Sequence, residues 1–272
     1  MPPLETSVPV VSDGADEVVR YEFSDGVATI TIDRPQRRNA LSWPVVGELR
    51  ACLARVRADD SVRVVVLTGA GDQAFCAGAD LEGMVGGETL ELHRSRGELA
   101  ALFQDLWSLG RPTIARVRGW CLAGGMGLAL SCDLVVAAED AVFGTPEVDV
   151  GLWPYMITVP LCRSMPPKRA LELMMTGRRV GAAEADRIGF VHSVVPVDGL
   201  DDAVAELAAT LASKSPAVLG LGRDSFYRVW DLAAADALHL LHPALGVAAE
   251  LDDASEGVAA FLERRPPNWT GR

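Results

Sequence analysis

The sequence predicts an α/β fold followed by a purely helical C-terminal region. Strand-like and helix-like segments alternate for roughly the first two thirds of the chain, and the pattern after that is helical. Such alternation is typical of helices packed on a largely parallel sheet. With 272 residues, the chain has room for one large domain with an appendage. We expect a flexible tail at 1–16, an α/β core at 17–197 and a helical region at 198–272.

The first expected elements are a β-hairpin and a helix. Val18–Phe23 and Ala28–Asp33 are rich in β-type residues, and Asp25-Gly26 lies between them. Asp-Gly between two such runs is a strong signal of a hairpin turn. A helix is expected at Ser42–Val56, because its serine is a suitable N-cap and Pro44 lies in the first turn, where proline is tolerated.

The remaining elements alternate in the same way. Val62–Thr68 contains consecutive Val and Leu residues, which is typical of a strand buried on both faces. The elements expected after it are a helix at Leu90–Leu109, a strand at Thr113–Val117, a helix at Leu122–Ser131, and strands at Leu134–Ala138 and Val191–Val195. The helical region that follows is rich in Ala and Leu, so we expect part of it to pack against another subunit.

Composition and charge exclude several classes of protein. Hydrophobic residues make up 49% of the chain and charged residues 23%, which suits a packed globule. The formal net charge of −12 argues against nucleic acid or an anionic membrane as a partner. The longest apolar runs have the length of strands, far below the ~18 residues of a membrane span. The N-terminus has neither a basic nor an apolar region typical of a secretion signal, so we expect a cytoplasmic protein.

Cysteine and histidine patterns do not predict a metal site. There are five cysteines, an odd number with no C-x-x-C pair, which favours reduced thiols over disulfides or zinc ligands. His239 and His242 have the spacing of a helical pair, but no third ligand is suggested, so surface histidines are the simpler interpretation. Cys76 and Cys121 are better explained as small core residues than as reactive thiols.

The first segment with possible chemistry follows the strand at Val62–Thr68. It runs from Gly69 to Leu81, and small side chains at Ala77, Gly78 and Ala79 leave the main chain open to a ligand. An ordinary strand–helix turn explains the same pattern, so both interpretations stay open from this segment alone.

The second segment is Cys121–Ala129, in which Gly124 and Gly125 open an apolar helix. Free N–H groups at a helix start favour a partial negative charge on a ligand. Two such donors from separate strand–helix junctions can form an oxyanion hole. Close packing of a neighbouring backbone on the glycines is the alternative. The chain has no G-x-G-x-x-G or Walker A motif, which disfavours a nucleotide cofactor.

The third segment is Phe143–Tyr155, which contains a carboxylate directly after a proline. Glu147 follows Pro146 among apolar residues, where loss of hydration would raise its pKa. Such a group is suited to move a proton beside a developing negative charge. Two alternatives are that Glu147 serves a helix dipole and that Asp149 is the functional acid.

Taken together, these segments resemble the crotonase, or enoyl-CoA hydratase/isomerase, superfamily. The resemblance runs from about Val18 to Trp269. The motifs that carry it are Ile32-Asp-Arg-Pro, Asn39-Ala-Leu41, Phe75-Cys-Ala-Gly-Ala-Asp-Leu81, Gly124-Gly-Met-Gly-Leu-Ala129, Cys132-Asp133, Phe143-Gly-Thr-Pro-Glu147 and Thr176-Gly177. The resemblance implies a spiral of ββα units with a C-terminal helical oligomerisation region, assembled as a homotrimer or a dimer of trimers.

The resemblance also implies an acyl-CoA thioester substrate, with no cofactor besides the coenzyme A of the substrate itself. The family's oxyanion donors fall on the N–H groups of Ala79 and Gly124, and its acid/base falls on Glu147. The other residues implied to contact the substrate are Arg37, Arg38, Ala40, Leu41, Ala77, Asp80, Leu81, Gly125, Gly127, Tyr155 and Arg264. The three arginines match positions near the CoA phosphates, Arg264 from a neighbouring subunit. Solvated surface charge is their alternative role.

The chain departs from the hydratase pattern at Gly127. Typical hydratases of the family carry a glutamate at this position and a second one after the proline, whereas this chain has only Glu147. A single carboxylate is better suited to shuttle a proton between carbons than to hold and split water, so the departure favours isomerisation. Position 127 lies almost one turn after Gly124, so we expect a side chain there to reach the same region as Glu147.

The sequence leaves the activity open in two ways. Either enoyl-CoA hydration or double-bond isomerisation fits the family resemblance, and a non-catalytic acyl-CoA-binding or RNA-binding relative is the alternative. Tyr155 lies where some isomerases of the family carry an acidic residue. Its two possible roles are a hydrogen-bond donor and an aromatic wall of the pocket.

Overall fold

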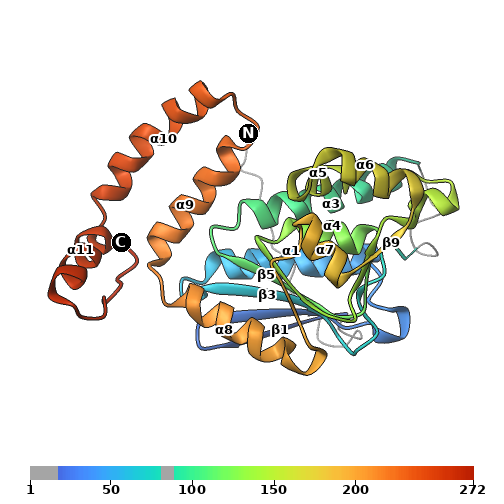
Figure 1. Ribbon diagram of the computed structural model, residues 1–272, viewed down its shortest axis with the longest axis horizontal. Coiled ribbons are helices and arrows are strands. Elements are labelled where there is room, and N and C mark those ends of the chain that lie inside the picture. The colour runs from blue at the N-terminus through green and yellow to red at the C-terminus, as the bar shows by residue number, and fades with distance from the viewer. Residues whose placement is uncertain (1–17, 81–88) are drawn as a thin grey trace, which may run out of the picture.

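Six strands form the larger of two sheets in the computed structural model, which describes residues 18–80 and 89–272. The strand order is β1-β2-β3-β5-β7-β10 (Figure 1). The strands are β1 (Val19–Ser24), β2 (Val27–Ile32), β3 (Val64–Gly69), β5 (Thr113–Val117), β7 (Leu134–Ala138) and β10 (Ser193–Val195). Every pairing from β2 onward is parallel, as expected for an α/β fold. The predicted tail at 1–16 and Leu81 lie outside the described residues.

The hairpin between β1 and β2 forms as predicted. Ser24 pairs with Val27, so the connection contains two residues. Asp25 and Gly26 both have positive φ, of 51° and 80°. This is the conformation that a type I′ turn requires, and Asp-Gly adopts it at low cost.

A second sheet contains four very short strands in the order β4-β6-β8-β9. They are β4 (Ala74–Cys76), β6 (Trp120–Leu122), β8 (Val142–Gly144) and β9 (Arg179–Gly181). The first three are mutually parallel. The expectation of a helix from Leu122 was wrong at its start, because Leu122 ends β6 and the helix begins two residues later. Strands of three residues are too short to show a period in the sequence.

Helices cover both faces of the larger sheet, and β3 shows why. Val64 and Val66 point to one face, where they pack with α8 (Leu200–Ala212), while Val65 and Leu67 point to the main core on the other face. Figure 1 shows α8 on one side of the sheet and most other helices on the opposite side. Those helices are α1 (Trp43–Ala58), α3 (Thr89–Trp107), α4 (Gly124–Ser131), α5 (Thr158–Ser164), α6 (Pro167–Thr176) and α7 (Ala182–Ile188).

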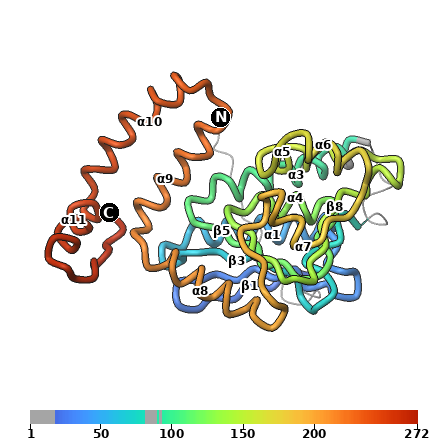
Figure 2. Tube along the Cα trace, viewed as in Figure 1, coloured from blue at the N-terminus to red at the C-terminus, as the bar shows by residue number. Residues whose placement is uncertain are grey.

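The last three helices form an arm that extends away from the sheets. They are α9 (Pro216–Val229), α10 (Ala234–Ala249) and α11 (Asp252–Glu263). The trace in Figure 2 shows α10 and α11 at the far side of α9 from the core. The C-terminal part of the chain is therefore helical as expected, although its first helix, α8, belongs to the packing of the larger sheet. Among the described helices none combines the length and apolarity needed to cross a bilayer.

Candidate active site

Three parallel strands of the smaller sheet end at one edge, and the segments predicted to carry chemistry follow directly. Leu122 of β6 pairs with Gly144 of β8, and Cys76 of β4 pairs with Cys121. The carboxyl ends of neighbouring parallel strands are where ligands bind in open α/β sheets. The fold thus brings 77–79, 123–124 and 145–147 to a common edge, although the sequence separates them widely.

A backbone bridge orients the first of these segments. The N–H of Leu41 donates to the carbonyl of Gly78 at 2.8 Å, and the N–H of Asp80 donates to the carbonyl of Leu41 at 2.7 Å. In this parallel bridge, the intervening Ala79 directs its own N–H to the opposite side of the segment. No described residue accepts a hydrogen bond from that N–H, so it is available to a ligand.

The second segment presents the start of α4. The N–H of Ala123 donates to the carbonyl of Gly144 at 2.8 Å, which ties the helix start to the end of β8. Gly124 is the first residue of the helix, where N–H groups have no intrahelical acceptor. Within the described part of the chain its N–H has no partner either. The helix dipole adds partial positive charge at this point.

Glycines allow these segments to touch. Gly78 has a φ of +103°, and a Cβ there would lie 2.7 Å from the Cβ of Ala123 and 3.7 Å from the nitrogen of Gly124. A Cβ at Gly125 would lie 2.3 Å from the carbonyl oxygen of Cys76. Close packing therefore requires both glycines, and the packing alternative holds for Gly125. It also brings the backbone at Gly78, next to Ala79, against the start of α4 at Gly124.

Glu147 is the carboxylate of the third segment. It lies in the 3₁₀ turn Pro146–Val150 directly after β8, and its side chain is partly buried. Its Oε2 atom is buried without a hydrogen-bond partner among the described residues. Burial raises the pKa of Glu147 to about 7, opposed by a hydrogen bond from its own backbone N–H. Asp149 is exposed, so Glu147 is the carboxyl that is poised for proton transfer near neutral pH.

The structure leaves no space for a side chain at Gly127. A Cβ at this position would lie 2.2 Å from Cγ2 of Ile157, 2.8 Å from its Cβ and 3.2 Å from Cζ of Phe103. No carbon atom fits at such distances, so Ile157 occupies the volume that a side chain at position 127 would need.

A turn beside the site carries the two predicted arginines. Arg37 ends a 3₁₀ turn and Arg38 follows with a φ of 51°, and both side chains are exposed. The carbonyl of Arg38 accepts the N–H of Ala77 at 3.0 Å, which fixes this turn next to the first segment. The guanidinium of Arg38 lies 5.6 Å from the ring centre of Trp120. Its charge is therefore beside the site and open to a phosphate.

Two buried or partly buried polar residues that the sequence analysis did not single out hold this turn in place. Asn39 is fully buried, and its Nδ2 donates to the carbonyls of Ala70 at 2.9 Å and Ala74 at 2.7 Å. Arg34 donates to the carbonyl of Ala40 at 2.7 Å and to the carboxylate of Asp80 at 2.9 Å. Arg34 and Asn39 belong to the motifs that carry the family resemblance. Their hydrogen-bond partners are distant in sequence and become visible only in the fold.

The structure does not bring every predicted residue to the edge. Tyr155 is 78% exposed, which fits a wall residue better than a fixed hydrogen-bond donor. Arg264 caps α11 in the arm, remote from the strand ends of its own chain (Figure 1). Cys76 and Cys121 are fully buried, and burial raises the pKa of both thiols, for Cys76 to about 12. In the part of the chain that the structure describes, no three His, Cys, Asp or Glu residues cluster as metal ligands.

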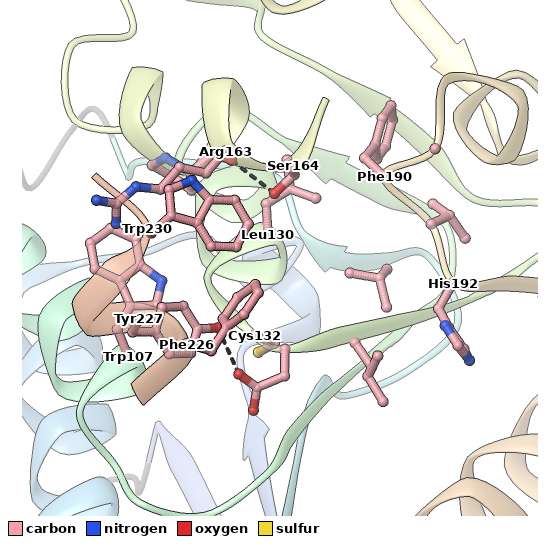
Figure 3. A pocket seen from close by; sticks show the side chains of 16 residues that line it. Trp107, Leu130, Cys132, Arg163, Ser164, Phe190, His192, Phe226, Tyr227 and Trp230 are labelled. Carbon is pink, nitrogen blue, oxygen red and sulfur yellow. Dashed lines mark hydrogen bonds between the residues drawn. The ribbon is translucent and has the colours of Figure 1, made fainter. Parts of the chain in front are cut away.

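A pocket of about 360 Å³ lies elsewhere, between α9 and the core. Figure 3 shows Trp107, Arg163, Phe226, Tyr227 and Trp230 along it. None of the residues predicted to contact the substrate lines this pocket. We therefore identify the edge at the ends of β4, β6 and β8 as the candidate active site.

Comparison with known proteins agrees with this geometry. The family model described as enoyl-CoA hydratase/isomerase matches residues 22–272. A probable enoyl-CoA hydratase of Mycobacterium bovis is 34% identical over 261 residues, which cover 94% of this chain and 99% of the relative. A carnitinyl-CoA dehydratase of Proteus mirabilis is 34% identical over 253 residues, which cover 90% of this chain and 95% of that protein.

Solved structures agree on the fold. An enoyl-CoA hydratase from Mycobacterium smegmatis superposes with a TM-score of 0.90 at 33% identity, covering 93% of this chain and 99% of that one. An enoyl-CoA hydratase from Bacillus anthracis gives a TM-score of 0.90 at 32% identity, covering 94% of this chain and 100% of that one. The fold and the superfamily resemblance predicted from the motifs are confirmed.

Proposed function

The chain belongs to the enoyl-CoA hydratase/isomerase family, and from this premise we propose that it moves the double bond of an enoyl-CoA thioester. The N–H groups of Ala79 and Gly124 hold the thioester oxygen while negative charge develops on it. Glu147 takes the proton from the α carbon and returns it at the γ carbon. No cofactor is required, because coenzyme A is part of the substrate.

The observation that carries this proposal is the state of Glu147. Its carboxyl has a pKa of about 7 and a buried oxygen without a described partner. It lies at the same sheet edge as the N–H groups of Ala79 and Gly124, for which the described residues provide no acceptor. A pKa near the working pH allows one group both to accept and to return a proton. The two donors supply what an enolate needs, because its negative charge rests on the thioester oxygen.

Isomerisation fits this site better than hydration. In the isomerisation, Glu147 removes an α proton from a 3-enoyl thioester, the C–H electrons form the new α,β double bond of the product through an enolate, and the γ carbon takes the proton back. Hydration instead adds a water molecule across the double bond, with its oxygen at the β carbon, and needs a group that holds that water. Ile157 and Phe103 fill the space beside Gly127 with apolar atoms, which hold no water.

Binding of the CoA moiety and assembly complete the proposal. Arg37 and Arg38 are exposed beside the site and would approach the nucleotide phosphates. Arg264 would reach them from a neighbouring subunit in a homotrimer or a dimer of trimers. The large apolar side chains that the arm leaves exposed support such assembly. They include Leu238, Leu245, Val247, Val258, Phe261 and Leu262. We further propose that the enzyme acts in the cytoplasm.

A panel of short 2-enoyl-CoA and 3-enoyl-CoA thioesters tests the activity. Shifted double bonds and 3-hydroxyacyl products are scored separately for the wild type, for Glu147→Gln and for the exposed control Asp149→Asn. The proposal requires double-bond shifting that Glu147→Gln removes and Asp149→Asn retains. Tight CoA binding without turnover would instead identify a binding protein. A salt-sensitive shift of RNA at physiological ionic strength would identify an RNA-binding protein.

A further inference from the structure

We infer that Ile157 determines reaction specificity, because its side chain fills the space beside α4 in which a second proton-transfer group would stand. This inference rests on the proposed function, since it concerns which of two enoyl-CoA reactions the site favours. It goes beyond the absence of a glutamate at position 127, because it states that restoring that glutamate is not enough.

The steric evidence is direct. Ile157 is 2% exposed, and its Cγ2 would lie 2.2 Å from a Cβ built on Gly127. Its Cβ would lie 2.8 Å away, and a Cβ moves little when the side chain changes rotamer. Phe103 closes the space from α3 with its Cζ at 3.2 Å. Any side chain at position 127 must therefore displace Ile157.

The backbone around Ile157 offers little freedom to move. The residue directly precedes α5, and its carbonyl accepts the N–H of Leu161 at 3.0 Å. The hydroxyl of Thr158 donates to the carbonyl of Pro154 at 2.9 Å. Met126 and Leu161 belong to the same buried cluster. Because close-packed interiors do not yield easily, the isoleucine is held where it stands.

Helix geometry relates this position to the candidate site. Residues three apart on a helix face the same side, with Cβ atoms about 5–6 Å apart. The Cα–Cβ bond of a helical residue also tilts toward the helix N-terminus. A side chain at position 127 would therefore lean toward Gly124, whose N–H is a proposed oxyanion donor. Ile157 occupies the space into which it would lean.

The consequence for chemistry follows from the atoms that each reaction must handle. Hydration forms a bond from water oxygen to the β carbon, moves one proton from that water to a base, and adds one proton at the α carbon. Isomerisation moves one proton from the α carbon to the γ carbon and needs no water. An apolar isoleucine offers no acceptor or donor to a water molecule, so Glu147 works alone.

The test combines two substitutions. Gly127→Glu, Ile157→Gly and their double variant are compared with the wild type on a 2-enoyl-CoA that has γ hydrogens, and the ratio of 3-hydroxyacyl product to shifted isomer is measured. Glycine is used at position 157 because alanine would keep the Cβ that lies 2.8 Å from a Cβ at position 127. The double variant should raise that ratio by at least about tenfold over the wild type and over either single variant. A gain as large as the ~10²–10⁴-fold of a fully positioned acid or base is not expected, because the new glutamate has no built surroundings. The matched control is Gly127→Glu with Leu161→Ala, which removes a buried side chain one turn further along α5.

Three results for the product ratio would overturn the inference. One is a folded Gly127→Glu single variant whose ratio equals that of the double variant. Another is a control pair that raises the ratio as much as the pair containing Ile157→Gly does. A folded double variant that keeps the wild-type ratio contradicts it equally.

Measurements of stability test the steric exclusion at position 127 independently of activity. Gly127→Ala should lower the urea midpoint of unfolding in the wild-type background. It should lower the midpoint much less in the Ile157→Gly background, where both the Cγ2 and the Cβ that block position 127 are absent. Strictly additive losses would contradict the inference. If the wild type turns over no enoyl-CoA, the proposed function fails, while this cycle still decides whether Ile157 excludes a side chain at position 127.

Discussion

The edge of the smaller sheet and the C-terminal arm are built in opposite ways. At the edge, backbone and side chains meet so closely that a Cβ on Gly78, Gly125 or Gly127 would lie under 3 Å from another atom. On the arm, Phe261 is 82% exposed, and large apolar residues of α10 and α11 face outward. The edge is therefore packed within the chain itself, whereas the apolar side chains of the arm stay exposed and are available for the subunit contact that we propose.

A polar cluster around Asp133 joins α9 of the arm to the core. The carboxylate of Asp133 accepts hydrogen bonds from the hydroxyl of Tyr227 at 2.6 Å, from Nε of Arg223 at 2.7 Å and from the N–H of Thr113 at 2.7 Å. Arg223 also donates to the carbonyl of Trp107 at 2.9 Å. Figure 3 shows the bond from Tyr227, which lies near the end of α9. Because Asp133 follows α4 closely, the arm is anchored next to the helix that begins at Gly124.

The largest effect should come from the carboxyl at the edge. Glu147→Gln keeps size and shape but cannot accept the proton, so turnover should fall by about 10²–10⁴-fold. Thioester affinity should change little, because both N–H donors remain. Steady-state kinetics with a 3-enoyl-CoA measures both quantities. Asp149→Asn is the matched control, and near-full turnover by Glu147→Gln would reject the role.

The next effect concerns the N–H of Gly124. Gly124→Pro removes it at the first helical position, where proline fits a helix, and should lower turnover by about 10²–10³-fold. Gly124→Ala is the control, because it keeps the N–H and its Cβ would lie 3.4 Å from Cδ1 of Leu41. Equal activities of the two folded variants would mean that the oxyanion donor lies elsewhere.

A smaller effect should come from the hydrogen bond that Tyr227 of α9 donates to Asp133. Tyr227→Phe removes a hydrogen bond to a carboxylate, which contributes about 1.5–3 kcal/mol. The free energy of unfolding should fall by that amount, and the arm should be cleaved faster by trypsin than in the wild type. Phe226→Leu changes the exposed neighbour and serves as control. Unchanged stability and cleavage would mean that other contacts hold the arm.

The sequence predicts those features of the fold and the site that depend on residues close together in the chain. The turn at Asp25-Gly26 and the strand around Val65 follow from local patterns, and the motifs were sufficient to predict the family. The three-residue strands β4, β6 and β8 could not be predicted, since their pairing partners are distant in sequence. The contact of Gly127 with Ile157 and the hydrogen bond of Tyr227 to Asp133 could not be predicted either, because both depend on how distant segments pack.

A further effect on stability follows from the raised pKa of Glu147. In the folded protein this carboxyl holds its proton up to a pH of about 7, whereas an unfolded glutamate releases it near ~4.3. Between these two pH values the native state binds more protons than the unfolded state. This group therefore lowers the free energy of unfolding as the pH rises from about 4.3 to about 7, and it has no further effect above pH 7. Urea midpoints at several pH values should fall more steeply for the wild type than for Glu147→Gln. Parallel curves would contradict the raised pKa.

The most direct test of the account follows the proton itself. A 3-enoyl-CoA with deuterium at the α carbon is converted in ordinary water, and the product is examined for deuterium at the γ carbon. If Glu147 carries the proton from one carbon to the other, part of the deuterium should reappear at the γ carbon, and Glu147→Gln should suppress the conversion. A product without γ deuterium, formed at an equal rate by the wild type and a folded Glu147→Gln variant, would contradict the account.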